Sequence, residues 1–221
     1  MVAPARKFRK PFTVSYGRPK MDSPSLHVDH FFPIPLRDSI SLRPLREKDA
    51  ESVFRVVDKN RDFLSKFLPW VPNVITVQQE VEWLSFFQEQ EMSGAGLHCG
   101  IFKEQISRDE RVEEIIGAAG LRVINFAKKT AQFGYWLAEE FTGSGLCTLA
   151  CRKLIEYGKA IGMERFEIHV AEDNLKSQAV ALRLGFHQCP KIIKSAEVVN
   201  NVPLSHIVFV LQLQEPTSTS E

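Results

Sequence analysis

The chain has 221 residues, 44% of them hydrophobic, and its formal net charge at pH 7 is +1. This length fits one domain of roughly 170–180 residues with short appendages. The small net charge argues against a dedicated nucleic-acid or membrane surface, and no apolar run approaches the ~20 residues of a membrane-spanning helix. The four cysteines have no CxxC spacing, and no secretory signal is evident, which predicts reduced thiols and a cytoplasmic location.

The two ends of the chain differ in composition from the middle. Residues 1–20 carry six Lys or Arg and no acid, and residues 1–37 are predicted to form a disordered basic arm with a short extended entry segment. This arm is a candidate for contact with a ribosome, although basic runs are more often simply solvated. The Pro/Ser/Thr-rich residues 215–221 are predicted to be a disordered tail, which leaves a single domain over 38–214.

The first half of the domain predicts one strand and two helices. Residues 39–45 alternate in polarity and end at a proline, as a strand does. Apolar residues at helical spacing predict a helix over 47–67, which the rigid segment 68–72 stops. A second helix is predicted over 77–90, with Thr76 as its N-cap and a glycine-containing stretch at 93–96 as its end.

The pattern then changes to a period of two, which is typical of strands. Strands are predicted over 97–102, 114–124 and 130–137, with polar turns at 103–113 and 125–129. A glycine turn and a helix ending at Gly162 follow, and then a strand at 166–170, a helix from Asp173 or Asn174 to 184, and strands at 192–199 and 205–213. This order predicts an α/β (α+β) fold: one mixed, mostly antiparallel sheet of about seven strands with flanking helices.

The segment 133–149 carries the most functional information. Its aromatic strand leads through a polar link into Gly143-Ser144-Gly145, and an amphipathic helix begins at Leu146. Glycines let the backbone approach an anion closely, and the first-turn N–H groups of a helix point at it with the positive end of the helix dipole. No Lys-Ser/Thr follows the glycines, as a P-loop requires, and no third glycine completes a dinucleotide fingerprint. The segment therefore predicts an anion cradle of another kind.

Five motifs, taken in this order, resemble the GCN5-related N-acetyltransferase (GNAT) superfamily, and within it the RimJ/RimL-type enzymes that acetylate ribosomal-protein N-termini. They are Leu42-Arg43-Pro44, Leu68-Pro69-Trp70, Phe133-Gly134-Tyr135-Trp136-Leu137, Gly143-Ser144-Gly145, and Asn174-x-x-Ser177 running into Leu184-Gly185-Phe186. The resemblance covers roughly residues 40–213. It departs at Glu140, where the superfamily often has Gln or Arg, so the cradle would depend on backbone donors.

The resemblance implies acetyl-CoA as co-substrate and no metal. The pyrophosphate would lie over the glycine turn, and the pantetheine arm would add like a strand to the end of strand 133–137. The residues implied in binding it are Tyr135, Trp136, Leu137, Thr142, Gly143, Ser144, Gly145, Leu146, Cys147, Asn174 and Ser177. Capping of a helix is an alternative role for Asn174 and Ser177.

The resemblance also implies two catalytic residues. Ser177 would donate a hydrogen bond to the departing thiolate, and Glu197 would act as base toward the amine, with Glu172 and Asp173 as the fallback. Phe63, Phe67 and Trp70 are candidates for lining the acceptor cleft, although aromatic residues at helical spacing are as often core. Transfer is expected to be direct, without an acyl-enzyme on Cys147.

The acceptor implied by the resemblance is the N-terminal α-amino group of a protein, most simply a ribosomal one. Two alternatives remain open at this point. One is acetylation of a small amine such as a polyamine or an antibiotic, and the other is a non-catalytic CoA-binding module associated with the ribosome. A homodimer is also left open.

Overall fold

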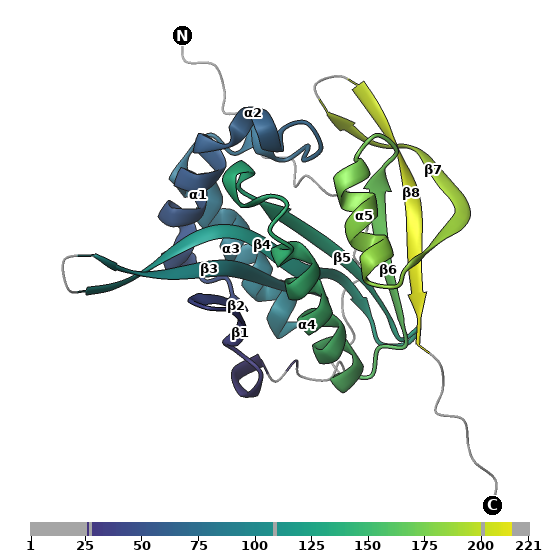
Figure 1. Cartoon of the computed structure of the whole chain (residues 1–221), viewed down its shortest axis with the longest axis horizontal. Helices are drawn as coiled ribbons and strands as arrows, with labels where there is room; N and C mark the ends of the chain where they lie inside the picture. Colours follow the sequence, from purple (N-terminus) through teal and green to yellow (C-terminus); the bar gives the residue numbers. More distant parts are fainter. Residues whose placement is uncertain (1–25, 27, 108–109, 200–201, 214–221) are drawn as a thin grey trace, which may run out of the picture.

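Figure 1 shows the computed structural model of the chain, which describes residues 26, 28–107, 110–199 and 202–213. These residues form one eight-stranded sheet with helices on its faces. The predicted mixed, mostly antiparallel sheet with flanking helices is confirmed, with one strand more than the seven expected. The predicted disordered tail and most of the predicted basic arm lie outside the described residues.

The strands are β1 (Ile34–Arg37), β2 (Ile40–Pro44), β3 (Leu97–Ser107), β4 (Glu110–Asn125), β5 (Thr130–Leu137), β6 (Arg165–Ala171), β7 (His187–Val199) and β8 (Val202–Gln212). The α-helices are α1 (Ala50–Lys59), α2 (Arg61–Leu64), α3 (Val77–Met92), α4 (Leu146–Ala160) and α5 (Leu175–Arg183). Short 3-10 turns lie at Val28–His30, Glu47–Asp49, Val71–Asn73 and Glu139–Phe141.

The order of strands across the sheet is β1-β2-β3-β4-β5-β6-β8-β7. All neighbours in the described sheet are antiparallel except β5 and β6, which are parallel. The paired part of β5 and β6 ends at Phe133 and Ile168, although β5 continues to Leu137 and β6 to Ala171. The two strands therefore separate beyond this point, and the sheet opens in its middle.

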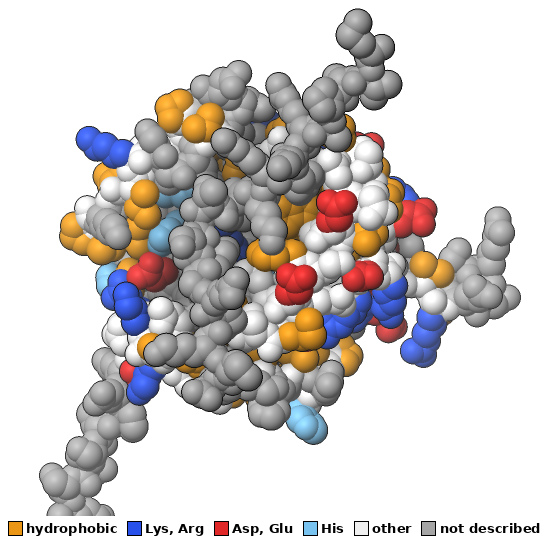
Figure 2. All heavy atoms as spheres, turned by 180° about the vertical axis from the view of Figure 1, so that it is seen from behind, with side chains coloured by type: hydrophobic (Ala, Val, Ile, Leu, Met, Phe, Trp, Pro, Cys, Tyr) orange, Lys and Arg blue, Asp and Glu red, His pale blue; other side chains and the backbone are white. Residues whose placement is uncertain are grey.

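Each face of the sheet is covered by a different pair of long helices. The larger core lies under α4 and α5 and includes Leu146, Leu154, Phe133 and Phe166. The smaller core lies under α1 and α3 and includes Leu84. Both acidic and basic side chains are visible among the described residues on the face seen from behind (Figure 2).

Two predicted elements differ from the structure. The helix predicted over 47–67 breaks at Asn60, whose side-chain amide donates to the Val56 carbonyl and whose Oδ1 accepts from the Glu139 N–H. Asparagine competes with the helix in this way because its side chain bonds nearby backbone groups. The polar turn predicted over 103–113 is wrong, because β3 and β4 continue as a hairpin. Both faces of this hairpin meet solvent, because the consecutive residues 104–106 and 111–114 are all exposed, Ile106 by 80%. The alternation of polarity is therefore lost.

No helix in the described part of the chain has both the length and the apolar character that spanning a membrane requires.

Candidate active site

The glycine turn lies between the end of β5 and the start of α4. Gly143 and Gly145 have φ of +78° and +82°, which is the left-handed region that glycine adopts without a steric penalty. Gly145 is the N-cap of α4 and provides no side-chain cap. The Ser144 hydroxyl donates to the Phe141 carbonyl, and the Thr142 hydroxyl to the Glu139 carbonyl. Because these side chains are used within the turn, the first backbone N–H groups of α4 stay available to an anion.

Where β5 and β6 separate, a side chain of β5 contacts the first turn of α5. The Tyr135 hydroxyl on β5 lies 2.8 Å from Ser177 Oγ and 3.2 Å from the Ser177 carbonyl oxygen on α5. Asn174 is the N-cap of α5, and its Oδ1 accepts from the Ser177 N–H at 3.1 Å. Asn174 therefore has the capping role, and the Ser177 side chain lies at the gap next to β5.

Two side chains near this gap have their pKa values raised by burial. Burial raises the pKa of Tyr135 above its usual value, so the phenol stays protonated and acts as a hydrogen-bond donor. Burial likewise raises the pKa of the Cys147 thiol to about 12, which the charge of Arg183 offsets only in part. At neutral pH Cys147 is thus a thiol rather than the nucleophilic thiolate.

The aromatic residues predicted for the acceptor side lie around the same end of β5. The Trp70 and Trp136 rings are 6.3 Å apart, and both residues are half-buried against the smaller core. The Phe63 ring has the Lys176 Nζ of α5 at 5.9 Å, so α2 approaches α5 here. A hollow of about 420 Å³ opens beside Phe63, lined also by Asp58, Lys59, Asn60, Arg61, Asp62 and Glu139. Phe67 is half-buried on the same segment.

The three candidate carboxylates lie toward β8. Glu197 is in β7, where its backbone is paired with Leu204 of β8, but its side chain lies outside what the structure describes. Glu172 and Asp173 are exposed at the end of β6, and the Glu172 N–H donates to the Ser205 carbonyl. The choice between Glu197 and the pair at the end of β6 stays a prediction.

Two charged contacts at the glycine turn were not predicted. Glu140, which departs from the family pattern, is paired with Lys59 of α1 at 3.0 Å, so a cation offsets its negative charge. Arg37, at the end of β1, donates through Nη2 to the Ser144 carbonyl at 3.0 Å. Neither contact has a sequence signal, because the partners are far apart in the chain and the periodicity of a four-residue strand is too short to recognise.

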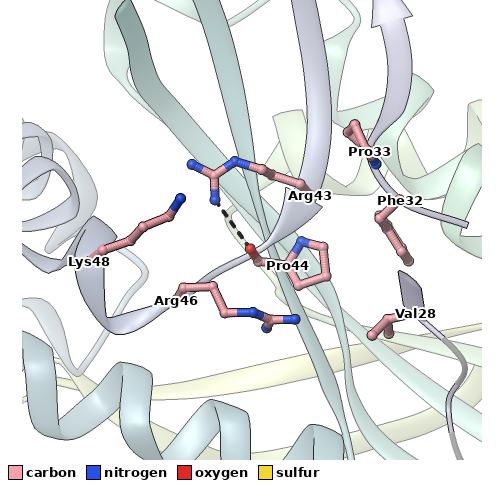
Figure 3. A pocket seen from close by; sticks show the side chains of 7 residues that line it. All are labelled: Val28, Phe32, Pro33, Arg43, Pro44, Arg46 and Lys48. Carbon is pink, nitrogen blue, oxygen red and sulfur yellow. Dashed lines mark hydrogen bonds between the residues drawn. The ribbon is translucent and has the colours of Figure 1, made fainter. Parts of the chain in front are cut away.

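A separate cavity of about 200 Å³ lies beside β2, and Figure 3 shows the side chains around it. Two of the three cationic side chains that line it form ion pairs within the protein. Arg43 is ion-paired with Asp49 and Glu113, and Arg46 with Glu91. These ion pairs hold β2 and the turn after it in place, and the cavity adds no group to the site at the glycine turn. Within the described ranges, no three His, Cys, Asp or Glu side chains are placed to hold a metal ion.

Comparisons with known proteins, by sequence and by structure, all find acetyltransferases. Residues 39–187 match the family model described as acetyltransferase (GNAT) domain. The ribosomal-protein-serine acetyltransferase of Escherichia coli (strain K12) is 32% identical over 174 residues, which cover 76% of this chain and 89% of that protein.

Two solved structures share the fold over most of their length. RimL, the ribosomal L7/L12 alpha-N-protein acetyltransferase in complex with coenzyme A, is 25% identical with a TM-score of 0.73, covering 81% of this chain and 97% of that one. The microcin C7 self-immunity acetyltransferase MccE, in complex with acetyl-CoA and AMP, is 29% identical with a TM-score of 0.71, covering 80% and 94%.

Proposed function

This chain belongs to the GNAT acetyltransferase family, and we propose that it transfers the acetyl group of acetyl-CoA directly to the N-terminal α-amino group of a ribosomal protein. The observation that carries the proposal is the meeting of three features at one point. They are the glycine turn at the start of α4, the part of β5 beyond Phe133 that has no partner in β6, and the Asn174–Ser177 turn of α5. The similarity to a ribosomal-protein-serine acetyltransferase supports this acceptor class.

The donor would be held mainly by backbone groups. Amides of residues 143–147 would bind the pyrophosphate, because they lie at the positive end of the α4 dipole. The Thr142 N–H, which was also expected to bind it, donates instead to the Glu139 carbonyl. Residues 135–137 of β5, which have no partner in β6, would bind the pantetheine arm as a neighbouring strand would. Asn174 fixes the first turn of α5, which sets Ser177 beside this arm.

The acceptor amine must lose a proton before it attacks. An α-amino group titrates near pH ~8, so only about a tenth is neutral at pH 7. We assign this proton to the Glu197 carboxylate, received directly or through one water molecule. The amine nitrogen then bonds to the acetyl carbon, the carbonyl oxygen becomes an oxyanion near the backbone N–H groups at the end of β5, and the C–S bond breaks.

The departing sulfur needs only modest assistance, since a free thiol has a pKa near ~8.5 and its thiolate is a stable leaving group near neutrality. Ser177 would donate a hydrogen bond to it. The Tyr135 hydroxyl lies 2.8 Å from Ser177 Oγ and 3.2 Å from the Ser177 carbonyl oxygen, and it has one proton to donate. We propose that this proton goes to Oγ when the donor is bound, which leaves the Ser177 proton to point at the sulfur. Tyr135 is then a positioning residue, in addition to any backbone contact with the donor.

A covalent acyl-enzyme on Cys147 is not expected, because burial keeps this residue as the neutral thiol. We expect the Cys147→Ala variant to retain at least half of the wild-type kcat, since the change removes only a half-buried sulfur. Steady-state assays with acetyl-CoA, together with intact-protein mass after acetyl-CoA alone, check this. An acetylated protein that disappears in the variant would contradict direct transfer.

The acceptor class is tested by turnover of acetyl-CoA over a panel of peptides that begin with Ser, Ala, Thr or Met. Spermidine and an Nα-blocked, lysine-containing peptide serve as controls. We expect the highest kcat/KM with one of the free N-termini and product mass increases located at the first residue. Higher kcat/KM for spermidine than for every peptide would contradict the proposal.

A small aminated compound is the second candidate acceptor, and one comparison favours it. The microcin self-immunity acetyltransferase is about as similar to this chain as RimL is. The hollow beside Phe63 does not separate the two, because its lining carries three carboxylates and two cations, and peptide N-termini and small amines are both cationic. Because the structure of that protein contains AMP, an amine-bearing AMP derivative added to the same panel would reveal this activity.

A further inference from the structure

The guanidinium of Arg37 lies against the glycine turn, although 107 residues separate it from Ser144 in the sequence. Its Nη2 donates to the Ser144 carbonyl at 3.0 Å. The same nitrogen would be 3.6 Å from a Cβ placed on Gly145. Because α4 also packs against β1, the strand sets this side chain beside the first residue of the helix.

The Ser144 carbonyl uses only one of the donors that this guanidinium presents. A guanidinium carries five N–H donors in a planar fork and remains charged at all working pH values. Among the described residues, Arg37 makes no ion pair with a carboxylate. Arg37 is exposed, so a ligand can reach its remaining donors.

Two other charged side chains near the turn have partners of their own. Glu140 is paired with Lys59, and Lys103 of β3 has its Nζ 5.7 Å from the Phe141 ring. The turn therefore combines the amides of α4 with side-chain positive charge on the β1 side. An anion with several oxygens fits this arrangement better than one with a single negative oxygen, because an Arg fork and a row of amides can bind different oxygens of the same group.

We propose that Arg37 is a CoA-binding residue whose guanidinium, held in place by the Ser144 carbonyl, bonds the pyrophosphate over the glycine turn. The inference rests on the proposed function, because it takes the pyrophosphate of acetyl-CoA as the ligand of the turn. It adds a side-chain cation to a site otherwise built from backbone donors, and it gives β1 a role in the donor site.

Isothermal titration of the full-length protein with CoA and with 3′-dephospho-CoA tests this proposal through affinity rather than turnover. We expect Arg37→Ala to raise the Kd about tenfold for both ligands, which corresponds to about 1.4 kcal/mol. Arg37→Lys keeps the charge and should raise the Kd by less, whereas Arg37→Gln keeps a donor for the Ser144 carbonyl without the charge and should resemble Arg37→Ala. Arg55→Ala, which removes an exposed arginine paired with Glu51 on α1, should leave the Kd unchanged.

Three outcomes would overturn the proposal. If Arg37→Ala bound CoA as tightly as the wild type, the guanidinium would make no contact with CoA. Wild-type affinity in Arg37→Gln would show that the residue only shapes the turn. A loss seen with CoA but absent with 3′-dephospho-CoA would assign the guanidinium to the 3′-phosphate instead. If the wild-type protein itself bound no CoA, the proposed function would fail, and that result is distinct from the three above.

Discussion

The hydroxyl groups of Tyr135 and Ser177 join β5 to α5 across the open part of the sheet. A serine hydroxyl can rotate freely, so its use as a donor to sulfur depends on what occupies its acceptor side. Tyr135 is the proposed partner: its hydroxyl lies 2.8 Å from Ser177 Oγ, and burial raises the pKa of the phenol, so it keeps a proton to donate. The proposed role of Ser177 as a donor thus depends on its hydrogen-bond partner Tyr135 as well as on its own hydroxyl.

We expect Tyr135→Phe to lower kcat about tenfold with little change in the Kd for CoA, and Ser177→Ala to lower kcat by a similar or larger factor. The double variant should lose little more than Ser177→Ala, because the two residues act through one hydrogen bond. Tyr157→Phe is the matched control: its hydroxyl donates to the Leu26 carbonyl, and its loss should affect stability but not kcat. Additive losses in the double variant would contradict the positioning role.

Glu80 in α3 predicts a pH dependence of stability that is separate from the site. The residue is 4% exposed, and its Oε2 has no hydrogen-bond partner in the part of the chain that the structure describes. Burial raises the pKa of Glu80 from 4.5 to about 7. Between these two pH values the folded state binds more protons than the unfolded state, so its contribution to stability falls as pH rises and levels off above 7.

Glu80→Gln removes this titration. At pH 8 the variant should be more stable than the wild type by about 2 kcal/mol, whereas at pH 5 the two should be nearly equal, because the protonated carboxyl resembles the amide. Urea unfolding at both pH values measures the difference. An equal difference at pH 5 and pH 8 would show that ionisation of Glu80 is not its cause.

At the scale of elements, α4 depends on a glycine at each end. Gly145 at its start and Gly162 just after its end have φ of +82° and +87°. An alanine at either position would strain the backbone by roughly 1–2 kcal/mol. Only Gly145 lies in the turn where the pyrophosphate is proposed to bind, so the two positions separate stability from ligand binding.

We therefore expect Gly145→Ala and Gly162→Ala to destabilise the protein by similar amounts, on the order of 1 kcal/mol, while only Gly145→Ala weakens CoA binding by several-fold. Thermal unfolding and titration with CoA on the same samples provide the two readings. Equal CoA affinity in the two variants would place the anion site away from the start of α4.

The sequence predicts most of these elements because their hydrophobic periods are long and their ends carry caps and glycines. It predicts the glycine turn and the Asn174–Ser177 turn for the same reason, since both are local. It predicts a short extended entry segment within residues 1–37 but neither the bounds of β1 nor a role for Arg37, because a strand of four residues has no clear period and the contact with Ser144 is set by the sheet. The break at Asn60 was missed because it depends on the Glu139 N–H, a partner distant in the sequence.

In the whole molecule, the proposed donor site and the proposed acceptor cleft lie with different helices on the two faces of the sheet. The helices α4 and α5 cover one face and flank the proposed donor site, whereas α1, α2 and α3 lie with the smaller core and the hollow beside Phe63. The single parallel pair in the described sheet, β5 with β6, opens at its end and connects the two sides. Donor and acceptor can therefore enter from different sides and meet beside Tyr135 and Ser177.

Donor binding and proton removal are proposed to depend on different parts of the chain. Comparing Glu197→Gln with the wild type tests this, using a peptide with a free N-terminal serine for kcat and CoA for Kd. We expect a fall in kcat of about 100-fold or more at pH 7, with an unchanged Kd for CoA and partial recovery of rate at higher pH. Wild-type kcat in this variant would contradict it and would move the base to Glu172 or Asp173.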